Sequence, residues 1–440
     1  MKNFRALQRL WLSLVAVFLL LLPLLHISAA PQSASQDLLG QADLVLQQMS
    51  ELTGLPIKSP LKKQIISRAE VEKYLAETLH AEMTPQEIHI QEATLQAFGL
   101  VSPDFNLEKF LISFYTEQAA GFYDPRRKTM FIADWVEPDM QRLVLAHELT
   151  HALQDQNFDL EKFLKAVRPD DDASSARQAM VEGHATAAMI QQLIAPMKLE
   201  DMPSLEPLMT QVIRQQYEEF PAFNRAPFFF RLQALFPYIE GMGFMQRGLQ
   251  AGGWKRLNSL FNDPPNTTKE IFEPQAYFEK QQLPKVSLPH PAALAGIPGL
   301  NFLAENTMGE LGYYAVLGQL ISEDEGKAVA TGWLADRYLL YERAAGPGPG
   351  LTREGKEYTL VSQTRWSSPE AALAFFRDYH SILARKYPEL TPDQRSTTDL
   401  FIGRAANGQV ILLRKGDECL WAEGIPTAQS DAMLNWLNSR

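Results

Sequence analysis

Two histidines separated by three residues, His147 and His151, have the clearest chemical meaning in this sequence. Residues four apart in a helix lie one above the other on the same face. Two imidazoles at this spacing can bind one metal ion, and the adjacent Glu148 can hold and deprotonate a water molecule there. We therefore expect one Zn²⁺ at this His-Glu-x-x-His segment, with His147 and His151 as ligands and Glu148 as the catalytic base.

The residues around this segment predict that its helix is buried. Positions 143–146, 149 and 152–153 are apolar or small. Two imidazoles and a carboxylate inside such a helix are costly unless a partner satisfies them, and a zinc ion does so directly. The alternative is a pair of hydrogen-bonded core histidines, which the specificity of the spacing disfavours.

A catalytic zinc usually takes three protein ligands and keeps one position for water. Since Cys419 is the only thiol, the third ligand must be His, Glu or Asp. Glu182 and His184 lie on the next predicted helix, and residues two apart point about 200° away from each other, so only one can face the ion. Small neighbours such as Gly183 would let the helix with Glu182 closely approach the helix that carries His147 and His151. The acidic run 170–172 is a further alternative, more typical of a solvated helix entry.

The flanking segments predict helices before and after a β-hairpin. The predicted helices lie at 68–80, 92–98, 107–117, about 137–156 and about 173–193, and the hairpin strands lie at 121–123 and 128–132. Residues 130–132, just before the first site helix, form either an edge on which an extended peptide docks or an ordinary inner strand. Further along, Thr267 and Glu270 have the spacing of a capping box.

A change in composition at 281–300, rich in Pro, Ala and Gly, predicts a domain edge. Beyond it, helices are expected at 308–321 and 368–386 and strands at 337–341, 358–363 and on both sides of Asn407-Gly408, with a Gly-Pro loop at 346–350. The expected fold class is α+β: a mostly helical core with a short antiparallel sheet, plus a smaller C-terminal α+β domain. Cys419 is expected to be a small core residue.

The composition excludes several classes of protein. The chain has 440 residues, of which 46% are hydrophobic and 21% charged, so it is too apolar for a disordered tail. One cysteine excludes an intrachain disulfide framework. A formal net charge of −11 argues against a nucleic-acid binder.

The N-terminus has the pattern of a secretory signal peptide. Lys2, Arg5 and Arg9 precede an almost wholly apolar run at 10–25, and small residues follow at 28–30. The run has 16 residues, shorter than the ~20 that span a bilayer, which favours cleavage near Ala29 over an uncleaved membrane anchor. Cleavage would make the net charge of the exported chain −14.

Residues 144–153 resemble the extended zincin pattern, and a later Glu on a following helix is the gluzincin arrangement of thermolysin-like and aminopeptidase-like enzymes. More closely, residues 117–125, 147–156, 182–186 and 264–268 resemble a little-characterised group of exported bacterial proteins with a gluzincin-like core. The resemblance covers about residues 70–280 well and the C-terminal part loosely. It implies a zincin fold and one zinc ion, and it favours Glu182 over His184 as the third ligand.

The chain departs from these patterns at two positions. Thermolysin-like enzymes carry an Asp four residues after the ligand Glu, supporting a zinc-binding imidazole, whereas this chain has Thr186. Asp155, four residues after His151, is a candidate for that support. The closer group is expected to have an acid at position 184, where this chain has His184, which leaves that residue an alternative ligand or oxyanion donor. Tyr238 is the other oxyanion candidate, with a buried structural tyrosine as the alternative.

These features predict an exported, periplasmic or secreted, zinc metallopeptidase acting on peptides or proteins. The predicted organisation is a signal peptide (1–29), a linker or pro-segment (30–69), a zincin-like domain (70–283) and a C-terminal α+β domain (284–440). The alternative is a zincin-fold protein that binds peptides or envelope partners through the same site with little or no hydrolysis. Hydrolysis of a non-peptide amide is a third possibility. Nucleic acid is not expected as a partner, and the membrane only through a retained signal segment.

Overall fold

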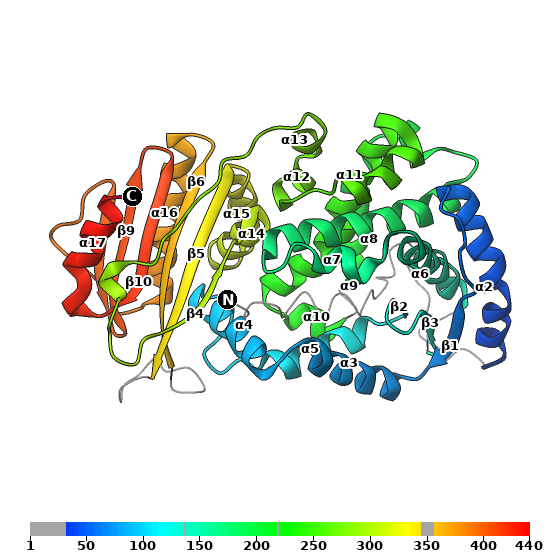
Figure 1. Ribbon diagram of the computed structural model, residues 1–440, viewed down its shortest axis with the longest axis horizontal. Helices are drawn as coiled ribbons and strands as arrows, with labels where there is room; N and C mark the ends of the chain where they lie inside the picture. Colours follow the sequence, from blue (N-terminus) through cyan, green and yellow to red (C-terminus); the bar gives the residue numbers. More distant parts are fainter. Residues whose placement is uncertain (1–31, 136–137, 218–219, 345–355) are drawn as a thin grey trace.

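The computed structural model describes residues 32–135, 138–217, 220–344 and 356–440. Figure 1 shows a helical part that carries a small sheet, beside a C-terminal part built on a larger sheet. This architecture confirms the expected α+β class. The elements of the helical part are α2 (Gln32–Thr53), β1 (Lys62–Ile66), α3 (Arg68–Glu82), α4 (Pro85–Ala97), α5 (Leu107–Gln118), β2 (Gly121–Asp124), β3 (Thr129–Ala133), α6 (Pro138–Phe158), α7 (Leu160–Lys165), α8 (Asp171–Ile194), η1 (Leu199–Asp201), α9 (Glu206–Tyr217), α10 (Pro221–Arg225), α11 (Phe228–Ser259), η2 (Leu260–Asn262), α12 (Thr268–Phe272) and α13 (Pro274–Phe278).

The small sheet has three strands in the order β1-β3-β2. β2 and β3 form the predicted antiparallel hairpin, while β1 pairs with β3 in parallel, with Ile65 opposite Ile132. The sheet is thus mixed, because a distant segment adds a parallel strand to the hairpin. Since β3 is paired on both sides, residues 130–132 form an inner strand, and the alternative of a peptide-docking edge there is wrong.

The segment before residue 70 is built into the folded part. Met49 of α2 is completely buried, and α2 packs against α6 and α8. The side chain of Gln156 in α6 accepts hydrogen bonds from the backbone N–H groups of Lys58 and Ser59. The predicted linker or pro-segment, 30–69, therefore contributes one helix to the core and one strand to the sheet.

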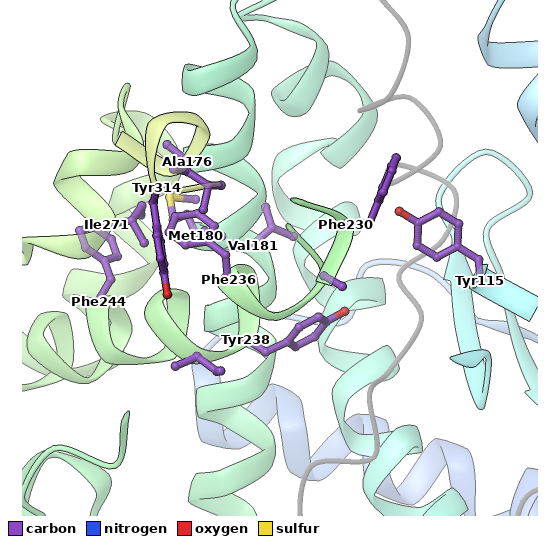
Figure 2. Packing of buried hydrophobic residues seen from close by; sticks show 14 of the residues in the cluster. Tyr115, Ala176, Met180, Val181, Phe230, Phe236, Tyr238, Phe244, Ile271 and Tyr314 are labelled. Carbon is purple, nitrogen blue, oxygen red and sulfur yellow. The ribbon is translucent and has the colours of Figure 1, made fainter. Parts of the chain in front are cut away.

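Helices α8 and α11 pack with very close backbones (Figure 2). A Cβ atom added at Gly183 would lie 2.2 Å from the carbonyl oxygen of Gly241, and one added at Gly241 would lie 2.2 Å from that of Ala179. Both positions therefore require glycine, because no side chain fits between the backbones. The small residues around Glu182 predicted a close approach to α6, but the closest backbone contact of Gly183 is with α11, so the predicted partner was wrong.

The acidic run at the start of α8 caps this helix and connects it to α12. Asp170 caps the helix by accepting the N–H of Ala173, as expected of a helix entry. Asp172, in contrast, is only 2% exposed and accepts the N–H and hydroxyl of Thr268, at 2.9 and 2.5 Å. The expectation of a solvated run is therefore wrong for Asp172. The predicted capping box of Thr267 and Glu270 is confirmed, and it orders the backbone that holds Thr268.

The C-terminal part is an antiparallel sheet of seven strands in the order β4-β5-β6-β10-β9-β8-β7. Its residues alternate between two cores: Leu340 and Leu412 belong to the core that includes Phe375, whereas Leu339 and Ile411 belong to the core that includes Met433. Cys419 is buried, as expected. The predicted loop at 346–350 lies outside the described residues. The elements are η3 (Ala292–Leu294), β4 (Asn301–Asn306), α14 (Gly309–Leu320), α15 (Glu323–Ala330), β5 (Trp333–Ala344), β6 (Lys356–Trp366), α16 (Pro369–Lys386), β7 (Thr391–Pro392), β8 (Leu400–Ala405), β9 (Gly408–Lys415), β10 (Glu418–Ile425), η4 (Thr427–Gln429) and α17 (Ser430–Asn438).

Across the described residues, no helix combines the length and the apolar character needed to cross a bilayer. The predicted signal peptide, 1–29, lies outside that part of the chain.

Candidate metal centre

Helix α6 places His147 and His151 on one face, as the spacing predicted. Their Nε2 atoms lie 2.9 Å apart, and both residues are completely buried. Burial lowers the pKa of His147 to about 4, so that the imidazole is neutral near pH 7. A neutral imidazole is the form that binds a metal ion.

Glu182 of α8 completes a cluster of three ligand atoms. Its Oε2 lies 3.2 Å from Nε2 of His147 and 3.3 Å from Nε2 of His151. Burial by itself raises the pKa of Glu182, but the charges and hydrogen bonds of His151 and His147 outweigh it and lower the pKa to about 2. A carboxylate and two imidazoles thus converge on one point. Within the described residues, no second cluster of His, Cys, Asp and Glu meets the same geometric test.

The donor set and its spacing fit a zinc ion. In a tetrahedral site with bonds of about 2.0–2.1 Å, ligand atoms lie about 3.3 Å apart. The three edges of the observed triangle, 2.9, 3.2 and 3.3 Å, are close to that value. Two histidines and one glutamate are also a ligand set of catalytic zinc sites. An ion here would balance the buried carboxylate, so we conclude that these residues could hold zinc.

Glu148 lies next to this cluster and is held by the sheet. Its Oε2 accepts the backbone N–H of Tyr123 in β2 at 2.7 Å, while its Oε1 is buried without a hydrogen-bond partner among the described residues. Burial and the nearby charge of Glu182 raise the pKa of Glu148 well above its usual range. One carboxylate oxygen is thus anchored, and the other remains available to a ligand.

The side chain that orients His151 is Gln154, which the sequence did not single out. The His151 Nδ1–H donates to Oε1 of Gln154 at 2.7 Å, which leaves Nε2 unprotonated and facing the cluster. The amide nitrogen of Gln154 donates to the carbonyl oxygen of Val181 and to Nδ1 of His184, each at 3.0 Å. Gln154 lies one turn after His151, and only the contact with α8 distinguishes it from other helix glutamines.

His184 lies outside the cluster of ligand atoms. Its Nδ1 accepts from Gln154, and its Nε2 donates to Oδ1 of Asn258 at 3.1 Å. The amide of Asn258 in turn donates to the carbonyl oxygen of Thr53 at 2.8 Å. Both ring nitrogens are therefore engaged, and the structure supports neither a ligand nor an oxyanion donor at this position. His184 supports Gln154 instead.

Asp155 does not support an imidazole, contrary to the sequence-based expectation. Its carboxylate accepts from the hydroxyl of Tyr123 at 2.7 Å, from Nζ of Lys128 at 2.6 Å and from the N–H of Leu160 at 3.2 Å. These partners turn it toward the sheet. Asp155 thereby holds the residue whose backbone N–H binds Glu148.

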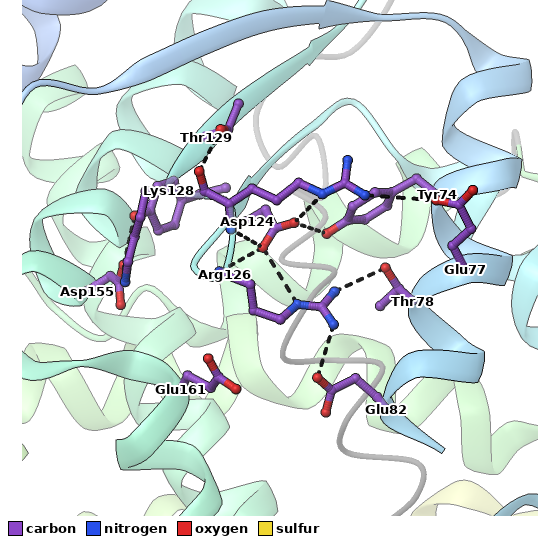
Figure 3. Close-up of polar contacts among 12 residues, drawn as sticks. Tyr74, Glu77, Thr78, Glu82, Asp124, Arg126, Lys128, Thr129, Asp155 and Glu161 are labelled. Atoms are coloured by element: carbon purple, nitrogen blue, oxygen red, sulfur yellow. Dashed lines mark hydrogen bonds and ion pairs between the residues drawn. The ribbon is translucent and has the colours of Figure 1, made fainter. Parts of the chain in front are cut away.

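The hairpin turn beside Asp155 is fixed by a second buried acid, Asp124 (Figure 3). Asp124 accepts from the hydroxyl of Tyr74 and from the N–H of Arg126, both at 2.8 Å. The guanidinium of Arg126 in turn donates to Glu82 at 3.1 Å and to Thr78 at 3.2 Å. Helix α3 thus locks the turn between β2 and β3, and with it the position of Tyr123. The sequence predicted the hairpin but not this contact with α3.

Tyr238 of α11 lies beside the cluster and is buried, which fits both sequence-based interpretations, an oxyanion donor and a structural tyrosine. Its ring centroid is 6.0 Å from that of His147, and the residue is 2% exposed. In Figure 2 the ring projects from α11 on the side where Phe230 and Tyr115 lie. Three further residues were singled out in the sequence. Tyr238 lies beside the cluster, Asp155 contacts the hairpin of β2 and β3, and His184 contacts Gln154.

The comparisons with known proteins agree with this geometry. Residues 104–191 match the model of the IrrE N-terminal-like domain, a zinc-metallopeptidase-like family, and this span contains Glu148 and all three residues of the cluster. Residues 300–434, which include the large sheet, match a domain of unknown function (DUF8575). No curated protein and no solved structure gives a significant match. The helical part of this chain is thus similar to a zinc-metallopeptidase-like domain over residues 104–191, and this span holds a candidate metal site.

Proposed function

We propose that this protein is a zinc-dependent peptidase in which His147, His151 and Glu182 hold one Zn²⁺. The observation that carries the proposal is the triangle of three ligand atoms with the carboxylate of Glu148 beside it. Zinc would supply Lewis-acid chemistry, polarising a carbonyl oxygen and lowering the pKa of water toward about 7.

The chain's own residues would carry the proton transfers. Burial raises the pKa of Glu148, and the positive charge of a bound metal ion would oppose this and favour the ionised carboxylate. In that form Glu148 would take a proton from the attacking water and deliver it to the nitrogen of the departing amine. The N–H of Tyr123 keeps the carboxylate of Glu148 oriented during both transfers. The hydroxyl of Tyr238 would donate to the oxyanion that develops at the scissile carbonyl.

The proposed substrates are peptides or proteins encountered outside the cytoplasm. The basic, apolar and small-residue order of residues 1–30 supports export with cleavage near Ala29, and the net charge of −11 disfavours nucleic acid as a partner. Expression in a bacterial host, followed by determination of the N-terminal residue of the exported protein, tests this part. A start at or next to Ala30 is expected, whereas a cytoplasmic protein that retains Met1 would contradict it.

Activity is tested by comparing the wild-type protein with Glu148→Gln. Zinc is measured in both proteins after metal-replete purification, and both are assayed on a broad peptide library. Glu72→Gln, on the exposed face of α3, is the matched control. We expect zinc in all three proteins and cleavage by the wild type and the control only. Absence of zinc from the wild type would overturn the proposal.

The second candidate function is metal-dependent binding or regulation without hydrolysis. Its support is the burial of the site: His147, Glu148 and His151 are fully buried, and Glu182 is 2% exposed. Members of the IrrE-like family are also often regulators. Zinc in the wild type with no cleavage of any peptide would favour this function. The presence of Glu148 beside the cluster favours the peptidase, because metal-dependent binding alone does not need a catalytic base.

A further inference from the structure

A series of hydrogen bonds connects His151 of the metal centre to the end of helix α2. It runs from His151 through Gln154, His184 and Asn258 to the backbone carbonyl oxygen of Thr53, with distances of 2.7, 3.0, 3.1 and 2.8 Å in that order. All of these residues except Asn258 are completely buried. We call these five residues the His151 relay. It joins α6, α8, α11 and α2, so a candidate metal ligand is linked to an element far from the cluster.

The three middle side chains of the His151 relay can each bind in two orientations. The amides of Gln154 and Asn258 have one donating end and one accepting end, and a neutral imidazole carries its N–H on either nitrogen. Burial lowers the pKa of His184 to about 4, so its ring is neutral near pH 7. The direction of the relay must therefore be set by a group that has only one role.

The carbonyl oxygen of Thr53 is such a group, because it can only accept. Asn258 must turn its NH₂ toward this oxygen, which leaves Oδ1 to face His184. Since Oδ1 accepts, the N–H of His184 lies on Nε2 and a lone pair remains on Nδ1. That lone pair accepts from the NH₂ of Gln154, whose Oε1 accepts the Nδ1–H of His151. Nε2 of His151 is thereby left unprotonated.

The opposite direction of the relay is incompatible with a metal ion. If Gln154 turned its NH₂ toward His151, Nδ1 of His151 would have to accept, and the N–H of the ring would lie on Nε2. Nε2 is the atom that faces His147 and Glu182. An imidazole binds a metal ion only through an unprotonated nitrogen. The orientation of one amide therefore decides whether the cluster offers two imidazole ligands or one.

The carbonyl oxygen of Val181 is a second anchor for the same orientation of Gln154. It accepts from the NH₂ of this residue at 3.0 Å. Loss of the bond to His184 would thus weaken the preference of the amide without abolishing it. The other imidazole of the cluster differs, because Nδ1 of His147 is buried without a hydrogen-bond partner among the described residues. His151 is the imidazole whose form is set by residues outside the cluster.

Local backbone geometry brings the far end of the relay together. Gly54, with a φ of +71°, follows α2 directly, so that the helix ends at Thr53. The last carbonyl oxygens of a helix have no partner within it, and that of Thr53 is available to Asn258. Helix α11 bends at Gly253, which has a φ of +64°, and Asn258 lies on the segment after the bend. The two glycine positions thus place a carbonyl oxygen and an amide beside His184.

We propose that Asn258 and His184 are positioning residues of the metal centre, which keep His151 competent to bind zinc by holding the amide of Gln154 in one orientation. Both lie outside the cluster of ligand atoms and act through Gln154. The inference rests on the zinc site of the proposed function. It also gives the end of α2 a role, because the carbonyl oxygen of Thr53 sets the direction of the relay.

The test is a double-mutant cycle on zinc affinity. Asn258→Leu removes both ends of the amide at similar size, and His184→Phe keeps an aromatic ring at that place. Each substitution is made in the full chain, alone and combined with Gln154→Leu, and zinc affinity is measured against a competing chelator. Asn435→Leu, at an exposed position of α17, is the matched control. The melting temperature of each metal-free protein shows that it is folded.

Asn258→Leu and His184→Phe are each expected to weaken zinc binding by about 3–10-fold, less than the roughly 10–100-fold typical of losing a direct outer partner such as Gln154. In the Gln154→Leu background, neither should change the affinity by more than about twofold, because both act through the residue already removed. NMR of isotope-labelled histidine nitrogens gives a second readout. It should show the N–H of His184 on Nε2 in the wild type and on both nitrogens, in exchange, in Asn258→Leu.

The outcomes separate this inference from the peptidase function. Unchanged zinc affinity in both variants, or the same loss with and without Gln154, would overturn the positioning role and leave the peptidase proposal standing. An N–H on Nδ1 of His184 in the wild type would also overturn it. The predicted losses of affinity in a protein that cleaves no peptide would support the positioning role and overturn the peptidase function. A wild-type protein that binds no zinc would overturn both.

Discussion

The helical part and the C-terminal sheet each bury a carboxylate, but they satisfy it differently. Glu423 of β10 is 1% exposed and has three partners: the hydroxyls of Tyr379 and Tyr387, at 2.6 and 2.8 Å, and Nζ of Lys386 at 2.5 Å. Glu148 of α6 is completely buried and has one partner, with Oε1 left unpaired among the described residues. A buried acid with every oxygen paired stabilises a fold. A buried acid with one oxygen free indicates a site that binds something further.

The largest expected effect is on catalysis and follows from substitution of Glu148, the buried acid with an unpaired oxygen. Glu148→Gln keeps the size of the side chain but removes the base, so kcat/KM for a cleaved peptide should fall by about 10²–10⁴-fold. Zinc content should not change, because Glu148 is not one of the three clustered ligands. Steady-state kinetics together with metal analysis checks both expectations. Cleavage at the wild-type rate would show that Glu148 is not the base.

The next effect is on stability and follows from substitution of Glu423, the fully paired acid of the C-terminal sheet. Glu423→Gln removes the charge that pairs with Lys386, which is itself 7% exposed. Removing one partner of a buried ion pair typically costs about 3–5 kcal/mol in the free energy of unfolding. Urea denaturation measures this loss, with exposed Glu389→Gln as control. Zinc binding should be unaffected; a variant as stable as the wild type would mean that Glu423 is not the structural acid described above.

A smaller effect concerns the residue that orients His151. Gln154→Leu removes the acceptor of the His151 Nδ1–H and the donor to His184. Loss of such an outer partner typically weakens metal binding by about 10–100-fold. Competition with a zinc chelator of known affinity measures the change, with Gln281→Leu, at an exposed position after α13, as control. Equal affinities in wild type and Gln154→Leu would show that the tautomer of His151 is set elsewhere.

The smallest effect concerns Lys128, whose side chain is 57% exposed although its partner Asp155 is fully buried. Lys128→Gln should change the free energy of unfolding by only about 1 kcal/mol, since solvent screens the exposed amine and Asp155 keeps its two other donors. Peptide cleavage should stay near the wild-type rate, because Tyr123 and Leu160 still hold Asp155. A large loss of activity on this substitution would assign the ion pair a direct role at the metal centre.

The sequence predicted those parts of the site that depend on local geometry. His147, Glu148 and His151 follow from spacing within one helix, and helix geometry on the next showed that only one of Glu182 and His184 could face the ion. The preference for Glu182 came from its small neighbours and from the resemblance to gluzincins. These predictions needed no knowledge of how distant segments meet.

The remaining features depend on contacts between segments far apart in the chain. Strand β1 pairs with β3 across a long intervening stretch, and Gln154 acquires its meaning only from Val181 and His184 on α8. The spacing of Asp155 from His151 suggested a contact with the imidazole, but Tyr123 and Lys128 attract its carboxylate instead. Helical spacing gives the direction of a side chain and leaves its partner undetermined.

X-ray absorption spectroscopy at the zinc edge, on protein loaded with one equivalent of zinc, tests the central claim most directly. The account predicts zinc with nitrogen and oxygen ligands at about 2.0–2.1 Å and outer-shell scattering from two imidazoles, and loss of an oxygen ligand in Glu182→Ala. Scattering from three imidazoles, or a spectrum unchanged by Glu182→Ala, would contradict a centre built from His147, His151 and Glu182.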